Sequence, residues 1–412
     1  MTAEALDLSV WPIFYRMSRR GLMVSFERLE ALLTEVRAKK EEQLFLCGEF
    51  AGRPINPNSG DDVGAWLAEQ GFTGKRTKTT HRLATDERSL SQYDHPAIEC
   101  ILQYRGLNKL EGTFILPVIE KAEQDRVEGM LCGVVHPRWR LTKVRSGRVA
   151  TEDPNLLAFP SRDEMGKKVR SCFVARPGYK FVSADYSQLE PRIVAALSGD
   201  PKLLRIYGED RDLYLEIAND LIVTRTVAKI LTLGILYGMG PHRLYEQLLL
   251  AGCKNDDGSP IYSEDACGAL IEKWFATYPS VRKLVQGTIN KARAANGWAF
   301  THGFRGRFLP GLFLEGRYWP NSKLREEAER QSFNHIVQGT GMECLKEAMV
   351  RIDQANLPDI HFLLAIHDEL VFEVPEGSVF AAPAIVEHMR TNFCGVELKV
   401  SASEAGDWGS LE

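Results

Sequence analysis

The sequence predicts an α+β protein in which a long helical insert separates two groups of strands of one sheet. Apolar residues recur at three- and four-residue spacing over 8–50 and 90–127, with Lys and Glu between them, and this pattern predicts helices. Short apolar runs alternate with turn signals over 131–184, and strand-like runs return beyond residue 355. Because a sheet needs several paired strands, the two groups are expected to meet across the helical stretch 186–355.

The composition is that of a globular protein with more than one lobe. The chain has 412 residues, of which 44% are hydrophobic and 26% charged, and this length predicts two or three lobes. No apolar run reaches the roughly 18 residues that cross a bilayer, and the N-terminus lacks a basic signal-like segment, so we expect no membrane partner and a cytoplasmic location. The eight cysteines form no CxxC pair, which suggests neither a zinc site nor a disulfide framework.

The net charge of −4 does not indicate a nucleic-acid partner, but a sum over the whole chain hides local clusters. The turn-rich stretch 51–88 contains Lys75, Arg76 and Lys78, and a second basic run spans 138–148. A solvated surface is the ordinary interpretation of such runs. Their neighbouring Thr, Ser and Gly residues also suit contacts with phosphates.

Two strand ends place carboxylates at one rim of the predicted sheet. In "HFLLAIHDELVFEVP" (361–375) two apolar runs flank the sequence His-Asp-Glu, which we expect to form a hairpin turn. A short strand also ends at Asp185 and precedes a helix over 188–197. Polar turns are common and Asp favours them, so the hairpin by itself predicts no function. The two strand ends together predict that Asp185 and Asp368 lie close to each other.

Such a pair of carboxylates has a chemical use. Two neighbouring anions repel unless cations lie between them, and Mg²⁺ prefers oxygen ligands and substrate phosphates. Two divalent ions can activate an attacking hydroxyl and neutralise the leaving group in phosphoryl transfer. Asp185 and Asp368 are therefore candidate metal ligands, whereas Glu369 either joins them or only caps the turn.

A helix with a mixed stripe is predicted next. Arg225, Lys229, Leu233 and Tyr237 recur every four residues, and Gly238 follows them. On an α-helix these side chains share one face, with two cations followed by an apolar and an aromatic surface. This face could bind a triphosphate and cover a base, although an amphipathic helix with a solvated basic end is the alternative interpretation.

The motifs resemble those of a known family. "SADYSQLE" with Asp185, the Arg225 to Gly238 helix and "HDE" at 367–369 occur in the order of motifs A, B and C of family A DNA polymerases, the group of bacterial DNA polymerase I. Further segments that resemble family landmarks, from "INPNS" and "DPNL" to "AERQSFNHIVQGT" and the terminal "DWG", extend over nearly the whole chain.

The resemblance implies a right-hand polymerase fold with an antiparallel-sheet palm and helical fingers and thumb. We expect the thumb and N-terminal helices at 1–130, the palm at 131–200 and 330–412, and the fingers at 201–329, with the motif B helix at about 224–238. The implied activity is template-directed addition of dNTPs to a primer 3′ end with two Mg²⁺ ions, for which Mn²⁺ can substitute. Primer–template DNA and dNTPs are the implied partners of a monomer, and no proofreading domain is expected in this chain.

The resemblance also implies roles for individual residues. Asp185 and Asp368 would bind metal, with Glu369 nearby and Lys229 taking part in catalysis, and Glu190 would block a ribose 2′-hydroxyl. The implied nucleotide-binding residues are Arg225, Lys229, Leu233, Tyr237, Gln188, Glu190 and Tyr214. The implied DNA-binding residues are Arg148, Asn155, Arg330, Asn334, Gln338 and His367 along the primer–template, and Lys75, Arg76 and Lys78 at the thumb tip.

Some positions depart from the family pattern. Leu233 stands where Phe or Tyr is usual. Leucine at this position resembles viral members of the family, which suggests a phage enzyme that acts in the host cytoplasm. Tyr214 replaces a common His, and Leu157-Ala158 replaces a Gln-Asn pair. A single-subunit RNA polymerase is a rival interpretation that Glu190 disfavours. A catalytically inactive, template-binding relative is another, which the retention of both aspartates and both helix cations disfavours.

Overall fold

The computed structural model describes residues 1–412 except 78–80, 162, 256, 315–318 and 412. Lys78 therefore lies outside the described residues. The centre of the molecule is an antiparallel four-stranded sheet with strand order β12-β5-β9-β8. Its strands are β5 (Tyr179–Tyr186), β8 (His361–Ile366), β9 (Glu369–Pro375) and β12 (Val400–Ala405). The expectation that strands from both sides of the helical insert meet in one sheet is confirmed.

Both faces of this sheet are covered, as the unbroken apolar runs of its strands require. Successive side chains point to opposite faces of a strand. Val182 and Phe372 accordingly pack in one core with α1 (Ala3–Arg20), α15 (Trp319–Gln354) and α16 (Ala381–Met389), whereas Phe181 and Val371 pack in a second core beneath the N-terminal arm. The sheet is thus a rigid support for the side chains at its rim.

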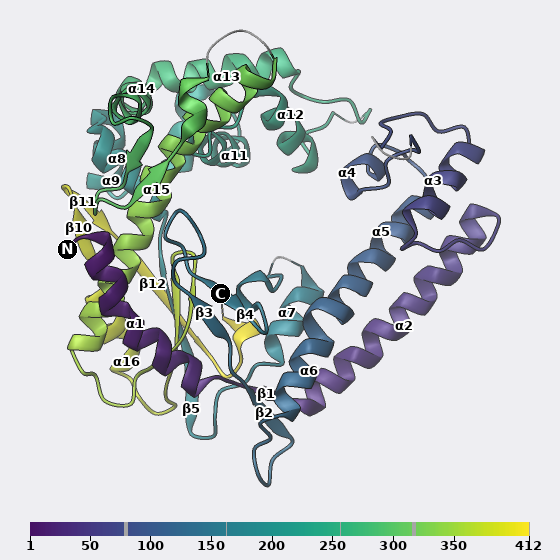
Figure 1. The fold of residues 1–412 in the computed structure, drawn as a ribbon, viewed down its shortest axis with the longest axis horizontal. Helices are drawn as coiled ribbons and strands as arrows, with labels where there is room; N and C mark the ends of the chain where they lie inside the picture. The colour runs from purple at the N-terminus through teal and green to yellow at the C-terminus, as the bar shows by residue number, and fades with distance from the viewer. Residues whose placement is uncertain (78–80, 162, 256, 315–318, 412) are drawn as a thin grey trace.

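The N-terminal arm is a long helical projection on one side of the sheet (Figure 1). Its elements are α2 (Phe26–Ala51), α3 (Gly60–Glu69), α4 (Glu87–Leu90), α5 (Pro96–Lys109), the π-helix η1 (Leu110–Ile115) and α6 (Leu116–Glu123). At its tip α3, α4 and α5 share a core of their own, which includes Trp66, Leu90 and Ile101. The arm therefore has a compact tip and two long helices that join it to the sheet.

The expectation of continuous helix over 8–50 is wrong at one place. The chain leaves α1 at Gly21, whose φ of 62° is in the left-handed region and whose Cβ, if present, would lie 2.6 Å from Val134. Only glycine fits there. Residues Leu22–Ser25 then form β1, which pairs with β2 (Cys132–Val135) before α2 begins.

The stretches interpreted as turn-rich and as strands also contain helices. The turn-rich stretch 51–88 includes α3, whose first turn is capped by the Ser59 hydroxyl. The strand-rich stretch 131–184 includes α7 (Glu164–Ser171), where the Asp163 carboxylate accepts the Gly166 N–H at 2.7 Å. The same stretch also contains the paired strands β3 (Arg138–Arg140) and β4 (Ala150–Glu152) and the short helix η2 (Leu156–Ala158). Local capping residues explain both helices.

The helical insert stands on the other side of the sheet, opposite the arm (Figure 1). Its helices are α8 (Leu189–Ser198), α9 (Pro201–Gly208), α10 (Leu213–Leu221), α11 (Arg225–Leu236), α12 (Pro241–Leu250), α13 (Glu264–Thr277) and α14 (Pro279–Ala294). They share one core, into which Trp274 and Tyr278 are fully buried. The remaining short elements are the hairpin β6 (Trp298–Phe300) with β7 (Gly306–Phe308), η3 (Pro310–Phe313), the pair β10 (Thr391–Phe393) with β11 (Val396–Leu398), and η4 (Trp408–Ser410).

Candidate active site

The predicted carboxylates meet at the rim of the central sheet. Asp185 is the penultimate residue of β5 and lies opposite Glu369 in the register with β9, and the Tyr186 N–H donates to the Asp368 carbonyl at 3.2 Å. The turn itself is His367-Asp368, with His367 at a φ of 54°. Glu369 is thus the first residue of a strand, and its expected place in the turn is wrong.

The electrostatics of this rim favour a bound cation. Burial, together with the neighbouring charges of Asp368 and Glu369, raises the pKa of Asp185 to about 7. Burial likewise raises the pKa of the Asp368 carboxyl. Positive charge brought to this rim would favour the ionised form of both carboxylates, because like charges at short range repel. The donor set therefore fits a divalent cation.

Glu369 is held differently from the two aspartates. The Ser183 hydroxyl donates to its Oε1 at 2.5 Å, and although burial raises the pKa of Glu369, this bond and the Arg170 charge oppose the rise. Within the described part of the chain, no group of three or more His, Cys, Asp or Glu side chains could hold a metal by itself. Mg²⁺ is commonly bound by one or two carboxylates together with substrate phosphates and water, and Asp185 and Asp368 match that pattern.

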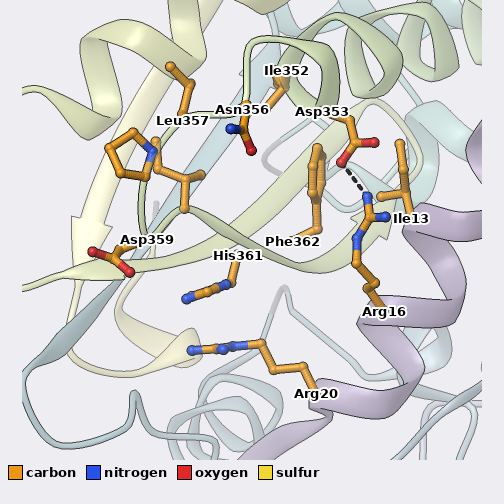
Figure 2. A pocket seen from close by; sticks show the side chains of 12 residues that line it. Ile13, Arg16, Arg20, Ile352, Asp353, Asn356, Leu357, Asp359, His361 and Phe362 are labelled. Carbon is orange, nitrogen blue, oxygen red and sulfur yellow. Dashed lines mark hydrogen bonds and ion pairs between the residues drawn. The ribbon is translucent and has the colours of Figure 1, made fainter.

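Two cavities compete as the substrate site. One, of about 650 Å³, opens at the sheet rim and is lined by Asp185, Asp368 and Glu369 together with Arg170. The other, of about 710 Å³, lies between α1 and β8, and Figure 2 shows Arg16 reaching from α1 to an ion pair with Asp353. The second cavity is lined by none of the predicted site residues, and its Asp353 carboxylate is already paired with Arg16. The rim cavity is therefore the candidate active site.

A three-residue cluster at this rim had no local signal in the sequence. Arg148 Nη2 donates to Glu190 Oε1 at 2.8 Å, and Tyr237 forms a side-chain hydrogen bond with the same carboxylate. Burial raises the pKa of Glu190, while Tyr237 and Arg148 act against that rise. The cluster joins the β3–β4 connection to the first turn of α8 and the end of α11.

Helix α11 presents the predicted stripe. Arg225 and Lys229 are exposed and Leu233 is half-buried, whereas Val227, Ala228 and Leu231 on the other side are buried in the core of the insert. The helix ends at Leu236, so Tyr237 is its C-cap and Gly238, with a φ of 67°, reverses the chain. Arg225, Lys229 and Leu233 lie on this helix as the spacing predicts, and Tyr237 lies just beyond its end.

The cation at the start of the stripe is oriented by its neighbours. Arg225 Nη2 donates to Asp212 Oδ2 at 2.7 Å, and its guanidinium lies 5.7 Å from the centre of the Tyr214 ring. Tyr214 itself is buried. Gln188 precedes α8 with a φ of 57°, and its Oε1 accepts the Tyr207 hydroxyl at 3.2 Å. Arg225 and Tyr214 thus lie on α11 and α10, and Gln188 lies directly before α8.

The predicted DNA-binding residues fall into three places. Arg330, Asn334 and Gln338 recur every four residues on α15, where Asn334 Nδ2 donates to the Tyr237 carbonyl at 3.2 Å. His367 is exposed in the hairpin turn and Asn155 is exposed after β4. Lys75 and Arg76 are exposed at the tip of the arm, far along the chain from the other two places.

Most cations of the second basic run form ion pairs within the molecule. Glu152 accepts Arg140 Nε at 2.9 Å, Lys143 Nζ at 2.6 Å and Arg138 Nη2 at 3.2 Å. The hydrogen bonds from Lys143 and Arg140 lower the pKa of Glu152 to about 2. The sequence suggested phosphate contacts for this run, but most of its cations lie on one carboxylate.

Comparison with known proteins defines the class. The family model "DNA polymerase family A" matches residues 25–410, so the chain belongs to this family. It is similar to a solved structure described as the "POL domain of Pol1 from M. smegmatis complex with DNA primer-template and dNTP", with a TM-score of 0.85, 28% identity and coverage of 98% of this chain and 70% of that one. This similarity confirms the α+β fold of a polymerase domain.

Curated relatives agree with the family. The chain is 34% identical to "DNA polymerase I, thermostable" of Thermus filiformis, over 96% of this chain and 47% of the relative. It is 31% identical to DNA polymerase I of Deinococcus radiodurans, over 93% of this chain and 39% of the relative. The chain thus spans about half the length of the curated relatives it matches. Among the described residues, no helix is long and apolar enough to cross a membrane.

Proposed function

We propose that the chain is a DNA-directed DNA polymerase that adds dNTPs to a primer 3′ end under the direction of a template. The observation that supports this most strongly is the pair Asp185 and Asp368, which share a sheet rim and a cavity in a chain of DNA polymerase family A. The structure similar to it is described as a complex with primer–template and dNTP. We assign the same ligands to the rim cavity of this chain.

The residues of the site have distinct tasks in this proposal. Asp185 and Asp368 hold divalent cations, which when bound lower the pKa of the attacking hydroxyl and neutralise charge on the leaving group. Arg225 and Lys229 bind the triphosphate, because cations suit its charge, and Tyr237 packs near the base pair being formed. Glu190 occupies the space of a ribose 2′-hydroxyl. Asp212 fixes the direction of the Arg225 guanidinium before the nucleotide arrives.

We further propose that the cation is Mg²⁺, with Mn²⁺ as a substitute, that the enzyme is a monomer, and that it acts in a cytoplasm. Leu233 supports an origin in a phage, whereas the curated relatives are bacterial.

The central test replaces one carboxylate at a time. Asp185→Asn and Asp368→Asn should each abolish primer extension and leave primer–template binding nearly intact, because duplex affinity comes from basic side chains and backbone contacts elsewhere. Asp353→Asn, in the cavity of Figure 2, is the matched control and should extend primers normally. Substantial extension by either rim variant would refute the assignment. Repeating the assay with rNTPs distinguishes a DNA polymerase from an RNA polymerase.

A further inference from the structure

The free ends of the arm and of the helical insert touch each other. Arg88 of α4 forms an ion pair with Glu246 of α12, and Arg88 Nη2 lies 3.5 Å from His242 Nε2. Figure 1 shows α4 at the tip of the arm, facing α12 across the side of the molecule that is remote from the body of the sheet. The arm and the insert both extend from the sheet, and this ion pair connects them again at their free ends.

The contact is supported from the side of the insert. Glu246 also accepts Arg243 Nη1 at 3.0 Å, and His242 Nδ1 lies 3.1 Å from Glu264 Oε2. The Glu246 side chain is only 17% exposed, although that of Arg88 is 61% exposed. The acceptor is thus held in place by α12 and α13, whereas the donor projects freely from the arm.

The contact is also supported from the side of the arm. The Asp86 carboxylate caps α4 by accepting the Ser89 N–H at 3.2 Å and the Ser89 hydroxyl at 2.7 Å. Leu90 is fully buried in the core of the arm tip. Helix α4 therefore moves with the whole tip, so breaking or making the Arg88 contact reports the position of the arm.

The base of the arm has a place at which it could bend. The π-helix η1 interrupts the regular helix between α5 and α6, and π-helices are rare and often lie at functional sites. Glu111 of η1 is held against α2 by Arg37 at 2.8 Å and Lys40 at 2.6 Å. An opening arm requires a bend near its base and a contact that breaks at its tip, and we assign these to η1 and to α4.

We propose that α4 and α12 form a latch that closes the molecule around primer–template and slows its dissociation. The sheet, the arm with α4, and the insert with α11 and α12 form a closed circuit, in which the Arg88 to Glu246 ion pair joins the arm to the insert (Figure 1). Exposed ion pairs are weak and screened by salt, so this latch opens readily to admit DNA. The inference rests on the proposed polymerase function, to which it adds retention of the DNA between successive additions.

The test compares variants that break the latch with a variant of an ion pair that lies wholly within the insert. Arg88→Ala and Glu246→Gln should each raise the dissociation rate of labelled primer–template, chased with excess unlabelled DNA, by roughly 1.5- to 5-fold at low salt. Each should shorten the extension made in one binding event. The double variant should be no worse than either single variant, because both changes remove one interaction. The effect should vanish at high salt, where the ion pair is screened.

The control is the exposed pair Arg282 and Glu272 within the insert, 2.7 Å apart. Arg282→Ala should leave dissociation unchanged, and thermal unfolding should verify that all variants fold. Single-nucleotide addition by pre-bound enzyme should also be unchanged in the latch variants. Dissociation rates equal to the parent's, or additive effects of the two single changes, would overturn the latch. Because dissociation is measured without dNTPs, a failure of the polymerase proposal would appear separately, as absent extension by the parent.

Discussion

Glu190 is a largely buried carboxylate, with its side chain 13% exposed, and it has two unlike partners, the Arg148 guanidinium and the Tyr237 hydroxyl. Its side chain keeps a fixed position because both partners come from other segments of the chain. Glu190→Ala should therefore admit ribonucleotides, since it removes a clash with the 2′-hydroxyl. We expect the dNTP over rNTP ratio of kcat/KM values to fall by at least about tenfold. Steady-state kinetics with one template and both nucleotides measure this ratio.

A size-matched variant separates volume from charge at this position. Glu190→Gln retains the volume of the side chain but not its negative charge, so it should still exclude ribonucleotides. It should nevertheless weaken nucleotide or primer binding through the loss of the Arg148 ion pair. A parent-like ratio in the Ala variant would show that Glu190 does not face the sugar.

Leu233 is half-buried on the stripe that follows Arg225 and Lys229. In the proposed site it faces the sugar of the incoming nucleotide, where leucine offers no hydrogen-bond donor. A dideoxynucleotide leaves polar groups of this site without a partner, at a cost of about 1–3 kcal/mol. Leu233→Tyr supplies a hydroxyl and should raise dideoxynucleotide use by a corresponding factor of roughly 5 to 150, whereas Leu233→Phe should not.

The measurement is the ratio of kcat/KM for dNTP over ddNTP in the parent and in both variants. Tyrosine and phenylalanine have nearly the same ring, so a difference between them isolates the hydroxyl. Equal ratios for the Tyr variant and the parent would place residue 233 away from the sugar.

At the scale of elements, strand β9 is tied to its surroundings by one buried acid. Glu373 is fully buried, and its Oε2 accepts Arg20 at 2.5 Å and Arg176 at 2.9 Å. Glu373→Ala leaves two cations without their partner, and breaking a buried pair costs about 3–5 kcal/mol. We expect the free energy of unfolding in urea to fall by roughly 3 kcal/mol.

A second ion pair on the same sheet is the control for that change. Glu404 of β12 accepts Lys180 Nζ of β5 at 2.6 Å, but its side chain is 40% exposed. Glu404→Ala should therefore reduce the free energy of unfolding by less than about 1 kcal/mol. Equal losses in the two variants would mean that burial does not determine the contribution of these pairs.

The elements that position the carboxylates could be predicted because each has a local pattern. An apolar run that stops at Asp185 and two apolar runs around His367 and Asp368 define β5, β8 and β9 without reference to the rest of the chain. The break at Gly21 could not be predicted, because its cause is close approach to Val134 on a distant strand. A glycine within an amphipathic pattern does not show by itself what it packs against.

Part of the candidate site could also be predicted from local patterns, and part could not. The stripe on α11 follows from helical periodicity alone. The contact of Arg148 with Glu190 and Tyr237 joins three separate segments, so no spacing in the sequence indicates it. The pairing of Arg140 and Lys143 with Glu152 likewise depends on how β3 and β4 come together, which the charge pattern of the sequence does not show.

At the scale of the whole molecule, the two basic runs differ in how much charge they offer to DNA. At the arm tip Lys75 and Arg76 are exposed, and Arg76 Nη1 donates to the His81 carbonyl at 2.8 Å, a neutral acceptor that leaves the charge of the guanidinium uncompensated by that bond. In the second run Arg140 is paired with Glu152. The tip is therefore the better candidate for phosphate contacts.

Salt dependence of binding tests this difference. Lys and Arg that neutralise phosphates release counterions, so the slope of log affinity against log salt changes by about 0.9 for each phosphate that is no longer neutralised. Lys75→Ala with Arg76→Ala should flatten the slope by about 1 to 2 units, because both cations sit on the tip that the latch would hold against the duplex. Arg140→Ala removes the same type of charge, but its partner is Glu152, so the slope should stay near the parent's.

Fluorescence anisotropy of labelled primer–template between about 50 and 200 mM salt gives these slopes. An unchanged slope in the double variant would return Lys75 and Arg76 to an ordinary solvated surface, and a change of equal size in Arg140→Ala would show that phosphates displace Glu152 from that run.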